Sequence, residues 1–315
     1  MTDVLRARHT LGRHLAPTPS NHYPALDRTT GATVLVKHEN VNPTGAFKVR
    51  GGLTLLSGMP AEERARGVVG YSTGNHAQSL AYAARTFSAG CTIVMPEGAN
   101  PTKAQAVRDL GADLVEHGAL FEECRARAEQ IAVEKRMRLA SAANEPAIVA
   151  GVATAYVELI EQAPDLDAII VPVGSGSGAA AACLVANALA PSCRIVAVQS
   201  SASPAAHDSW RKGELLERPN RTRAEGLATG CAFELTQRIL REHLDDFVLV
   251  GDDAIQQAQW TMLTDAHTLA EGAGAAALAA VLQDPTSYAG KRVGIMCSGG
   301  NASPSEIRTV AGGAA

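Results

Sequence analysis

The most informative stretch of this sequence is Asn42-Pro43-Thr44-Gly45-Ala46-Phe47-Lys48-Val49-Arg50-Gly51-Gly52. An Asn-Pro turn and a glycine place Lys48 beside Phe47 at the start of an expected helix. A lysine held there can be desolvated, which lowers its pKa from about 10.4 and frees its amine for Schiff-base chemistry. Alone, the pattern also fits a solvated surface lysine, so its meaning depends on the rest of the chain.

A second polar motif, Ser72-Thr73-Gly74-Asn75-His76, directly follows the apolar run Gly67–Tyr71. This order predicts a strand, a tight turn and a helix N-terminus, where hydroxyl, amide and backbone donors converge. Such a site binds carboxylates and other anions. Thr73 or Asn75 could instead only cap the helix, and His76 could be an ordinary surface histidine.

A glycine-serine loop, Gly174-Ser175-Gly176-Ser177-Gly178, follows the apolar run Ala168–Pro172. Alternating glycines let the backbone approach an anion closely. The loop and Ala179 also fit the dinucleotide pattern G-x-G-x-x-G/A. The next apolar run, however, ends at Gln199-Ser200 without an acid for a ribose hydroxyl, and no Gly-Lys-Ser/Thr sequence follows the loop. A single phosphate on a small cofactor fits the loop better than a pyrophosphate.

A late motif, Cys297-Ser298-Gly299-Gly300-Asn301, closes the last apolar run of the chain, Val293–Met296. It is typical of a strand end whose serine hydroxyl points into a crevice, although an ordinary tight turn would have the same composition. Glu225 and Glu271 each precede a glycine and are acidic candidates for the same site. Either could also be a plain acid at a helix N-terminus.

The composition is that of a globular protein, with 46% hydrophobic and 19% charged residues. The net charge of −4 gives no global field that would favour nucleic acid or an anionic membrane. The six cysteines form no CxxC pair, so we expect neither a disulfide framework nor a metal site. Met1–Leu15 lacks the apolar core of a secretion signal, and no apolar stretch is long enough to span a bilayer, so a cytoplasmic location is expected.

Short β-type runs alternate with amphipathic segments, which predicts an α/β protein with largely parallel strands. The expected strands are Thr33–His38, Val68–Ser72, Cys91–Met95, Asp113–Glu116, Ala168–Val173, Arg194–Gln199, Phe247–Val250 and Arg292–Cys297. The expected helices are Asn75–Phe87, Pro101–Leu110, Leu120–Met137, Ile148–Gln162, Gly178–Ala190, Ala254–Ala266 and Gly272–Leu282. The polar, proline-punctuated segment Ser201–Thr222 is predicted to be a long surface loop.

Taken together and in this order, the four motifs resemble those of the threonine/serine dehydratase and serine racemase group of pyridoxal-phosphate (PLP) enzymes. The resemblance covers nearly the whole chain, from about Pro17 to Asn301. It implies the tryptophan-synthase-β-like fold, with two three-layer αβα domains built on mostly parallel twisted sheets. Residues 1–45 and 141–315 would form a large cofactor-binding domain, and residues 46–140 a small domain closing over the substrate. It also implies a homodimer or larger homo-oligomer.

The resemblance further implies roles for individual residues. Lys48 would form the Schiff base, Asn75 would bind the phenolic oxygen of the cofactor, and Ser298 would meet its pyridine nitrogen. The full cofactor set is Phe47, Lys48, Asn75, Gly174, Ser175, Gly176, Ser177, Gly178, Glu271 and Ser298. The substrate set is Ser72, Thr73, Gly74 and His76, and the catalytic pair is Lys48 and Thr73.

Three positions depart from the family pattern. Ala46 stands where a serine often precedes the Phe-Lys pair. Thr73 stands where racemases place a serine on the cofactor face opposite the lysine, so racemase activity is in question. Gln199 stands where some members bind a divalent cation through a glutamate, which weakens any metal assignment.

The expected activity is PLP-dependent β-elimination of a β-hydroxy amino acid, L-threonine or L-serine first, giving a 2-oxo acid and ammonia. Alternatives on the same fold are serine racemisation, dehydration of another β-hydroxy amino acid such as hydroxyaspartate or a compound of hydroxyectoine breakdown, and β-replacement. A nicotinamide-dependent oxidoreductase using the Gly174 loop is the alternative from a different class.

Overall fold

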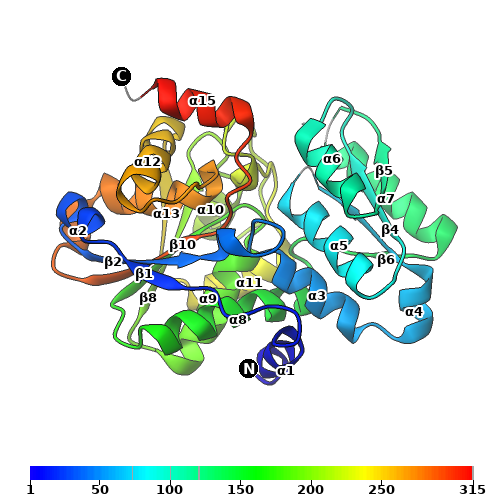
Figure 1. Ribbon diagram of the computed structural model, residues 1–315, viewed down its shortest axis with the longest axis horizontal. Helices are drawn as coiled ribbons and strands as arrows, with labels where there is room; N and C mark the ends of the chain where they lie inside the picture. Colours follow the sequence, from blue (N-terminus) through cyan, green and yellow to red (C-terminus); the bar gives the residue numbers. More distant parts are fainter. Residues whose placement is uncertain (73, 100, 120, 314–315) are drawn as a thin grey trace.

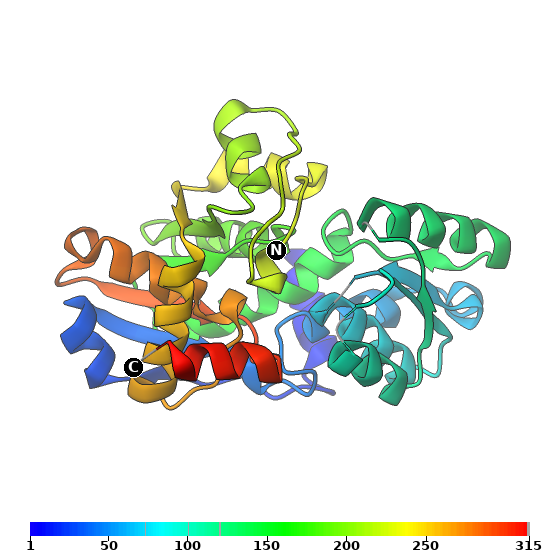
Figure 2. The same ribbon diagram turned by 90° about the horizontal axis from the view of Figure 1, so that it is seen from above.

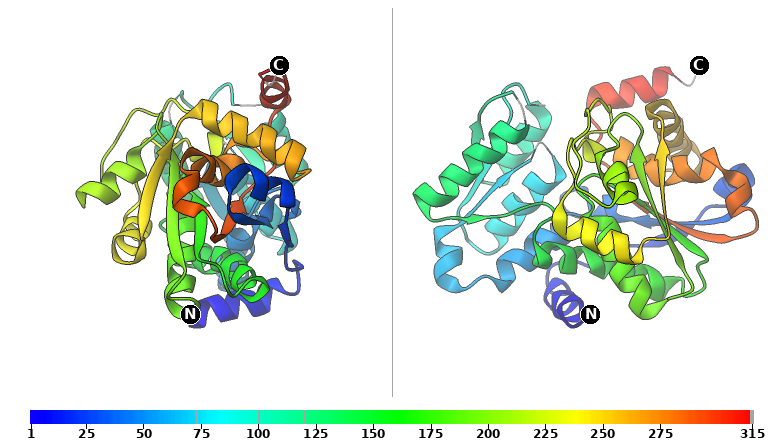
Figure 3. Two further views of the ribbon diagram at one scale, coloured as in Figure 1. Left: turned by 90° about the vertical axis from the view of Figure 1, so that its left-hand side faces the viewer. Right: turned by 180° about the vertical axis from the view of Figure 1, so that it is seen from behind.

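The computed structural model describes residues 1–72, 74–99, 101–119 and 121–313. Two α/β units lie side by side, as Figures 1 and 3 show. The larger unit is built on a six-stranded sheet and the smaller on a four-stranded sheet. All four strands of the small sheet fall within residues 46–140, the predicted small domain. The exact boundaries of the two domains remain a prediction.

The large sheet has the strand order β1-β2-β10-β7-β8-β9. Every neighbouring pair is parallel except β1 and β2, so the sheet carries one antiparallel edge strand. Its strands are β1 (Ser20–His22), β2 (Thr33–His38), β7 (Ala168–Pro172), β8 (Arg194–Ser200), β9 (Asp246–Val250) and β10 (Arg292–Cys297). Central strands such as β7 are buried along their whole length, because helices cover both faces of the sheet.

Successive side chains of the central strands point to opposite faces of the large sheet, and each face has its own hydrophobic core. Ile169 and Val171 point to the face covered by α8 (Pro146–Gln162) and α9 (Ser177–Leu189). Ile170 points to the face covered by α12 (Asp252–Asp265) and α13 (Gly272–Gln283). The Ala-rich α13 is buried along most of its length, since small side chains let it pack closely against the sheet.

The small sheet has the order β5-β4-β3-β6, and all of its strands are parallel. Its strands are β3 (Val68–Tyr71), β4 (Cys91–Met95), β5 (Asp113–Glu116) and β6 (Arg138–Leu139). One face packs on α3 (Val49–Gly58), α5 (Asn75–Thr86) and α6 (Pro101–Asp109), and the other packs on α7 (Phe121–Lys135). Both units therefore have the predicted three layers, and the predicted fold class is confirmed.

The remaining elements connect or flank these two units. They are α1 (Thr2–Leu11), α2 (Pro24–Thr30), η1 (Glu39–Val41), α4 (Ala61–Arg66), α10 (Ala205–Lys212), η2 (Glu225–Leu227), α11 (Glu234–His243), α14 (Pro285–Tyr288) and α15 (Pro304–Gly312). In Figure 1, α1 and α15 place the two ends of the chain on opposite sides of the molecule.

The predicted loop Ser201–Thr222 is wrong in part, because it contains the helix α10. This helix begins after Pro204 and ends at Gly213, which adopts the left-handed conformation at the C-cap (φ 77°). Its Trp210 packs at the edge of the large core and donates a hydrogen bond from Nε1 to Leu240 O (3.1 Å). The segment around α10 projects from the large unit at the top of Figure 2.

Candidate active site

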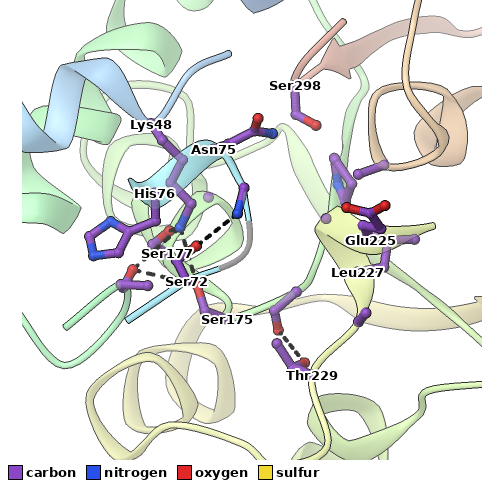
Figure 4. Close-up of a pocket in the computed structure, with 18 of the residues that line it drawn as sticks. Lys48, Ser72, Asn75, His76, Ser175, Ser177, Glu225, Leu227, Thr229 and Ser298 are labelled. Carbon is purple, nitrogen blue, oxygen red and sulfur yellow. Dashed lines mark hydrogen bonds between the residues drawn. The ribbon is translucent and has the colours of Figure 1, made fainter. Parts of the chain in front are cut away.

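The four sequence motifs meet in one cavity between the two units. Each motif follows the carboxyl end of a parallel strand or lies against one: β3 leads to Ser72, β7 to Gly174 and β10 to Ser298. Binding sites of open α/β sheets lie at this edge of the strands. Figure 4 shows side chains from both units converging there.

Lys48 lies immediately before α3 and extends into the cavity. Its Nζ donates hydrogen bonds to Ser177 Oγ (2.8 Å), Ser175 Oγ (3.2 Å) and Ala142 O (3.3 Å). The same nitrogen lies 5.2 Å from the centre of the Phe47 ring. No carboxylate neutralises it among the described residues, and burial lowers its pKa to about 8. A much larger fraction of this amine is therefore neutral near pH 7 than of a surface lysine.

The backbone around Lys48 is fixed from both units. Phe47 N donates to Ser298 O (3.0 Å), and Ser79 Oγ donates to Lys48 O (2.5 Å). Gly45 turns the chain with φ +66°, and a Cβ there would meet Asn301 Oδ1 at 2.4 Å. The turn and the close approach of Asn301 therefore both favour glycine at position 45.

The Gly174–Gly178 loop forms a close-packed cradle at the start of α9. A Cβ on Gly174 would lie 2.3 Å from Gly226 O, and Gly176 has φ +89°. Within the described residues, none of the five N–H groups from Gly174 to Gly178 donates to a backbone carbonyl. The loop thus offers backbone donors, two serine hydroxyls and a helix N-terminus to an anion.

Asn75, Glu271 and Asn301 form a hydrogen-bonded chain across the cleft. Asn75 Nδ2 donates to Glu271 Oε1 (2.5 Å), and Asn301 Nδ2 donates to Asn75 Oδ1 (2.8 Å). Glu271 is buried, and burial raises the pKa of its carboxyl. Ser298 is also buried and lines the cavity beside them.

The Ser72–His76 turn supplies the start of α5. Ser72 Oγ accepts a hydrogen bond from Gly74 N (3.2 Å). His76 is buried, pairs through Nε2 with Ala140 O (3.1 Å), and burial lowers its pKa to about 4. The alternative of an ordinary surface histidine is therefore wrong for His76. Thr73, the remaining predicted residue of the turn, lies outside the described residues.

Sequence reasoning missed a charged pair at this cavity. Lys103 of α6 and Glu225 of η2 both line it and form an ion pair across the two units. Glu225 was a candidate, but Lys103 was not. The signal available for Lys103 was its position four residues before Val107, which places the lysine on the buried face of its helix.

Comparison with known proteins decides the family. The family model described as pyridoxal-phosphate dependent enzyme matches residues 11–299. The chain belongs to this family. The PLP cofactor predicted from the motifs is thereby confirmed. The alternative interpretation of the Gly174 loop as a dinucleotide site is not supported.

Relatives within the family carry ammonia-lyase and racemase names. The L-threonine ammonia-lyase of Thermotoga maritima is 34% identical over 302 residues, which cover 96% of this chain and 75% of the relative. The L-threo-3-hydroxyaspartate ammonia-lyase of Saccharomyces cerevisiae is 32% identical over 99% of this chain and 96% of the relative. The solved structure of maize serine racemase superposes with a TM-score of 0.93 at 28% identity, covering 99% of this chain and 97% of that one. The predicted lyase class agrees with the names of the two ammonia-lyases.

The residues of the cavity fit PLP. A primary amine of lowered pKa, a glycine loop packed too closely for a Cβ at Gly174, and a neutral hydroxyl at Ser298 match the aldehyde, phosphate and pyridine nitrogen of the cofactor. The described residues contain no group of three His, Cys, Asp or Glu side chains able to hold a metal ion. They also contain no helix that is long and apolar enough to cross a membrane.

Proposed function

We propose that this enzyme dehydrates and deaminates a β-hydroxy amino acid, with L-threonine or L-serine as substrate, to give a 2-oxo acid and ammonia. The observation that carries the proposal is the Lys48 amine, held by Ser175 and Ser177 at the edge of the glycine cradle in a chain of the PLP family. The threonine and hydroxyaspartate ammonia-lyases among its relatives support the reaction class.

In this proposal the cofactor is held by the set predicted from the sequence. Lys48 would bind its aldehyde carbon, the Gly174–Gly178 loop would bind its phosphate, and Ser298 would meet its pyridine nitrogen. Asn75 would bind the phenolic oxygen, with its amide held by Glu271, and Phe47 would pack beside the ring. Bound PLP withdraws electrons from the substrate Cα, and the protein supplies orientation and proton transfer.

Lys48 is the proposed catalytic base. Once its amine is free, Nζ takes the proton from Cα, which a pKa of about 8 allows near neutral pH. The Ser175 and Ser177 hydroxyls, within 3.2 Å and 2.8 Å of Nζ, hold the amine in position before and after this transfer. Loss of water from Cβ and hydrolysis of the released enamine then give the 2-oxo acid and ammonia.

The substrate carboxylate is proposed to bind at the N-terminus of α5. The positive end of the helix and the donors of the Ser72–His76 turn favour an anion there. His76 is neutral at physiological pH because its pKa is about 4, so it contributes position rather than charge. The part of Thr73 in this site and in catalysis stays a prediction.

The test is a panel of β-hydroxy amino acids given to the purified holoenzyme, with 2-oxo acid, ammonia and enantiomer measured together. We expect 2-oxobutanoate from L-threonine. Racemised serine without 2-oxo acid, or turnover of hydroxyaspartate alone, would replace the proposal with one of its alternatives. Lys48→Ala should abolish turnover and the borohydride-fixed attachment of PLP, whereas Lys291→Ala, at a lysine that bonds only Ser287 O within the described residues, should keep both.

We also propose that the enzyme works as a homodimer or larger homo-oligomer in the cytoplasm, as the resemblance implies. The six cysteines support the compartment, since all are free and five are buried. Light scattering of the purified protein at several concentrations measures the oligomeric state.

A further inference from the structure

A lysine in the cavity is unused by the proposed chemistry. Lys103 extends from α6 of the small unit, and its side chain is 8% exposed. Its Nζ lies 3.8 Å from the position that a Cβ on Gly74 would occupy, next to the start of α5. Its charge also acts on Glu271 at the centre of the site, where it opposes the rise of the carboxyl pKa. Lys103 is therefore a cation inside the substrate space, not at its rim.

The partner of Lys103 comes from the other unit. Glu225 begins η2 of the large unit and accepts a hydrogen bond from Lys103 Nζ through Oε2. Its side chain is 45% exposed, in contrast to the buried lysine. Figure 4 shows the Glu225 carboxylate at the cavity, across from Lys48 and near Leu227. The carboxylate thus lies on the solvent side of the pair, and the ammonium lies inside the site.

The charges that line the cavity leave a dicarboxylic substrate few partners. Among the described residues, the lining carries two lysines, Lys48 and Lys103, two glutamates, Glu225 and Glu271, and no arginine. Because Lys48 is required for the cofactor, Lys103 is the one lysine of the described lining that is left to pair with a substrate. A second substrate carboxylate needs such a cation, because an anion left unpaired in a closed site is strongly disfavoured.

We propose that Glu225 determines the specificity of this enzyme by holding Lys103, so that the site favours β-hydroxy amino acids with neutral side chains over those with a carboxylate. The inference rests on the proposed function and narrows its substrate class. A dicarboxylic substrate reaches Lys103 only after displacing Glu225, and it then faces that carboxylate at close range. A neutral side chain leaves the ion pair intact.

The experiment compares kcat/KM for L-threo-3-hydroxyaspartate and L-threonine in four holoenzymes. The wild type should prefer threonine. Glu225→Gln frees the ammonium without changing the side chain's shape, and should raise the hydroxyaspartate-to-threonine ratio at least tenfold. Adding Lys103→Met to Glu225→Gln should remove that gain, which identifies the lysine as its source. Glu116→Gln, which breaks the ion pair of Arg108 on the same helix outside the cavity, should keep the wild-type ratio.

A binding measurement gives a second readout without turnover. Calorimetry of the holoproteins should show succinate binding at least tenfold tighter to Glu225→Gln than to wild type, with propionate changed less than twofold. The inference is overturned if Glu225→Gln leaves both the hydroxyaspartate-to-threonine ratio of kcat/KM and the succinate affinity unchanged. The inference is also overturned if Lys103→Met weakens the binding of propionate as much as that of succinate, because the lysine would then be a ligand of the α-carboxylate. If the wild type turns over neither amino acid, the proposed function fails, and the succinate measurement alone then tests the inference.

If Glu225→Gln does not fold, Glu225→Ala takes its place in both experiments.

Discussion

Arg50 donates two hydrogen bonds to Glu39, from Nε to Oε2 (2.7 Å) and from Nη2 to Oε1 (2.8 Å), and both side chains are buried. Arg50 also donates from Nη1 and Nη2 to Glu158 on α8 (2.7 and 2.8 Å). It lies two residues after Lys48, so this buried cluster fixes the start of α3 and with it the lysine. The adjacent Glu39 and Arg50 charges hold the pKa of the Glu39 carboxyl down and that of the Arg50 guanidinium up.

Arg50→Met should therefore destabilise the protein strongly. Removing the guanidinium leaves the buried carboxylates Glu39 and Glu158 with less compensation, and breaking a buried ion pair on one side costs about 3–5 kcal/mol. Urea unfolding followed by circular dichroism measures the loss. Arg8→Met removes an exposed pair with Glu161 and should cost less than about 1 kcal/mol. Equal losses in the two variants would contradict a structural role for the buried cluster.

Much of the fold could be predicted from the sequence because the central strands of both sheets are parallel and buried. A strand covered on both faces is a short continuous apolar run, and Thr33–His38, Cys91–Met95 and Arg292–Cys297 were predicted with the bounds that the structure shows. β1 and β6 were missed, since Ser20–His22 and Arg138–Leu139 are short, lack a continuous apolar run and lie at the edges of their sheets. Their pairing depends on long-range partners that no local pattern reveals.

The residues of the motifs could be predicted from the sequence, but the ion pairs in and around the site could not. Phe47, Lys48, Asn75, Gly174 and Ser298 were found because each follows a strand end or a tight turn, and the structure brings them to one cavity. The ion pair of Lys103 and Glu225 joins positions 122 residues apart. The cluster of Arg50, Glu39 and Glu158 is likewise formed only when distant elements pack together.

The pKa of Lys48 makes capture of PLP by the apoenzyme depend on pH. Only the neutral amine attacks an aldehyde, so the rate should rise about tenfold per pH unit below pH 8 and level off above it. A solvated lysine would reach this plateau only above about pH 10. Stopped-flow absorbance after mixing apoenzyme with PLP gives the profile. A midpoint near pH 10 would show that burial does not lower the pKa of this amine.

His76 should make the fold sensitive to mild acid. Its pKa is about 4 in the folded protein against about 6.5 in the unfolded chain, so the unfolded state takes up a proton first as the pH falls. The free energy of unfolding should drop between pH 6.5 and 4, by up to about 3 kcal/mol from this residue. His76→Gln should flatten this part of the profile in urea unfolding, whereas His9→Gln, at an exposed histidine of α1, should leave it as in the wild type. A His76→Gln profile as steep as the wild type would assign the acid sensitivity to other groups.

Gly174→Ala should weaken cofactor binding because the added Cβ would lie 2.3 Å from Gly226 O, a backbone atom that cannot turn aside. The loop has to shift, which carries its N–H donors away from the phosphate, and at least a tenfold rise in the PLP dissociation constant is expected. Fluorescence titration of the apoenzyme with PLP measures it. Gly251→Ala adds the same methyl group where no atom lies within 4 Å, and its PLP affinity should stay within twofold of the wild type. If Gly174→Ala binds PLP as tightly as Gly251→Ala does, the phosphate is not held by this loop.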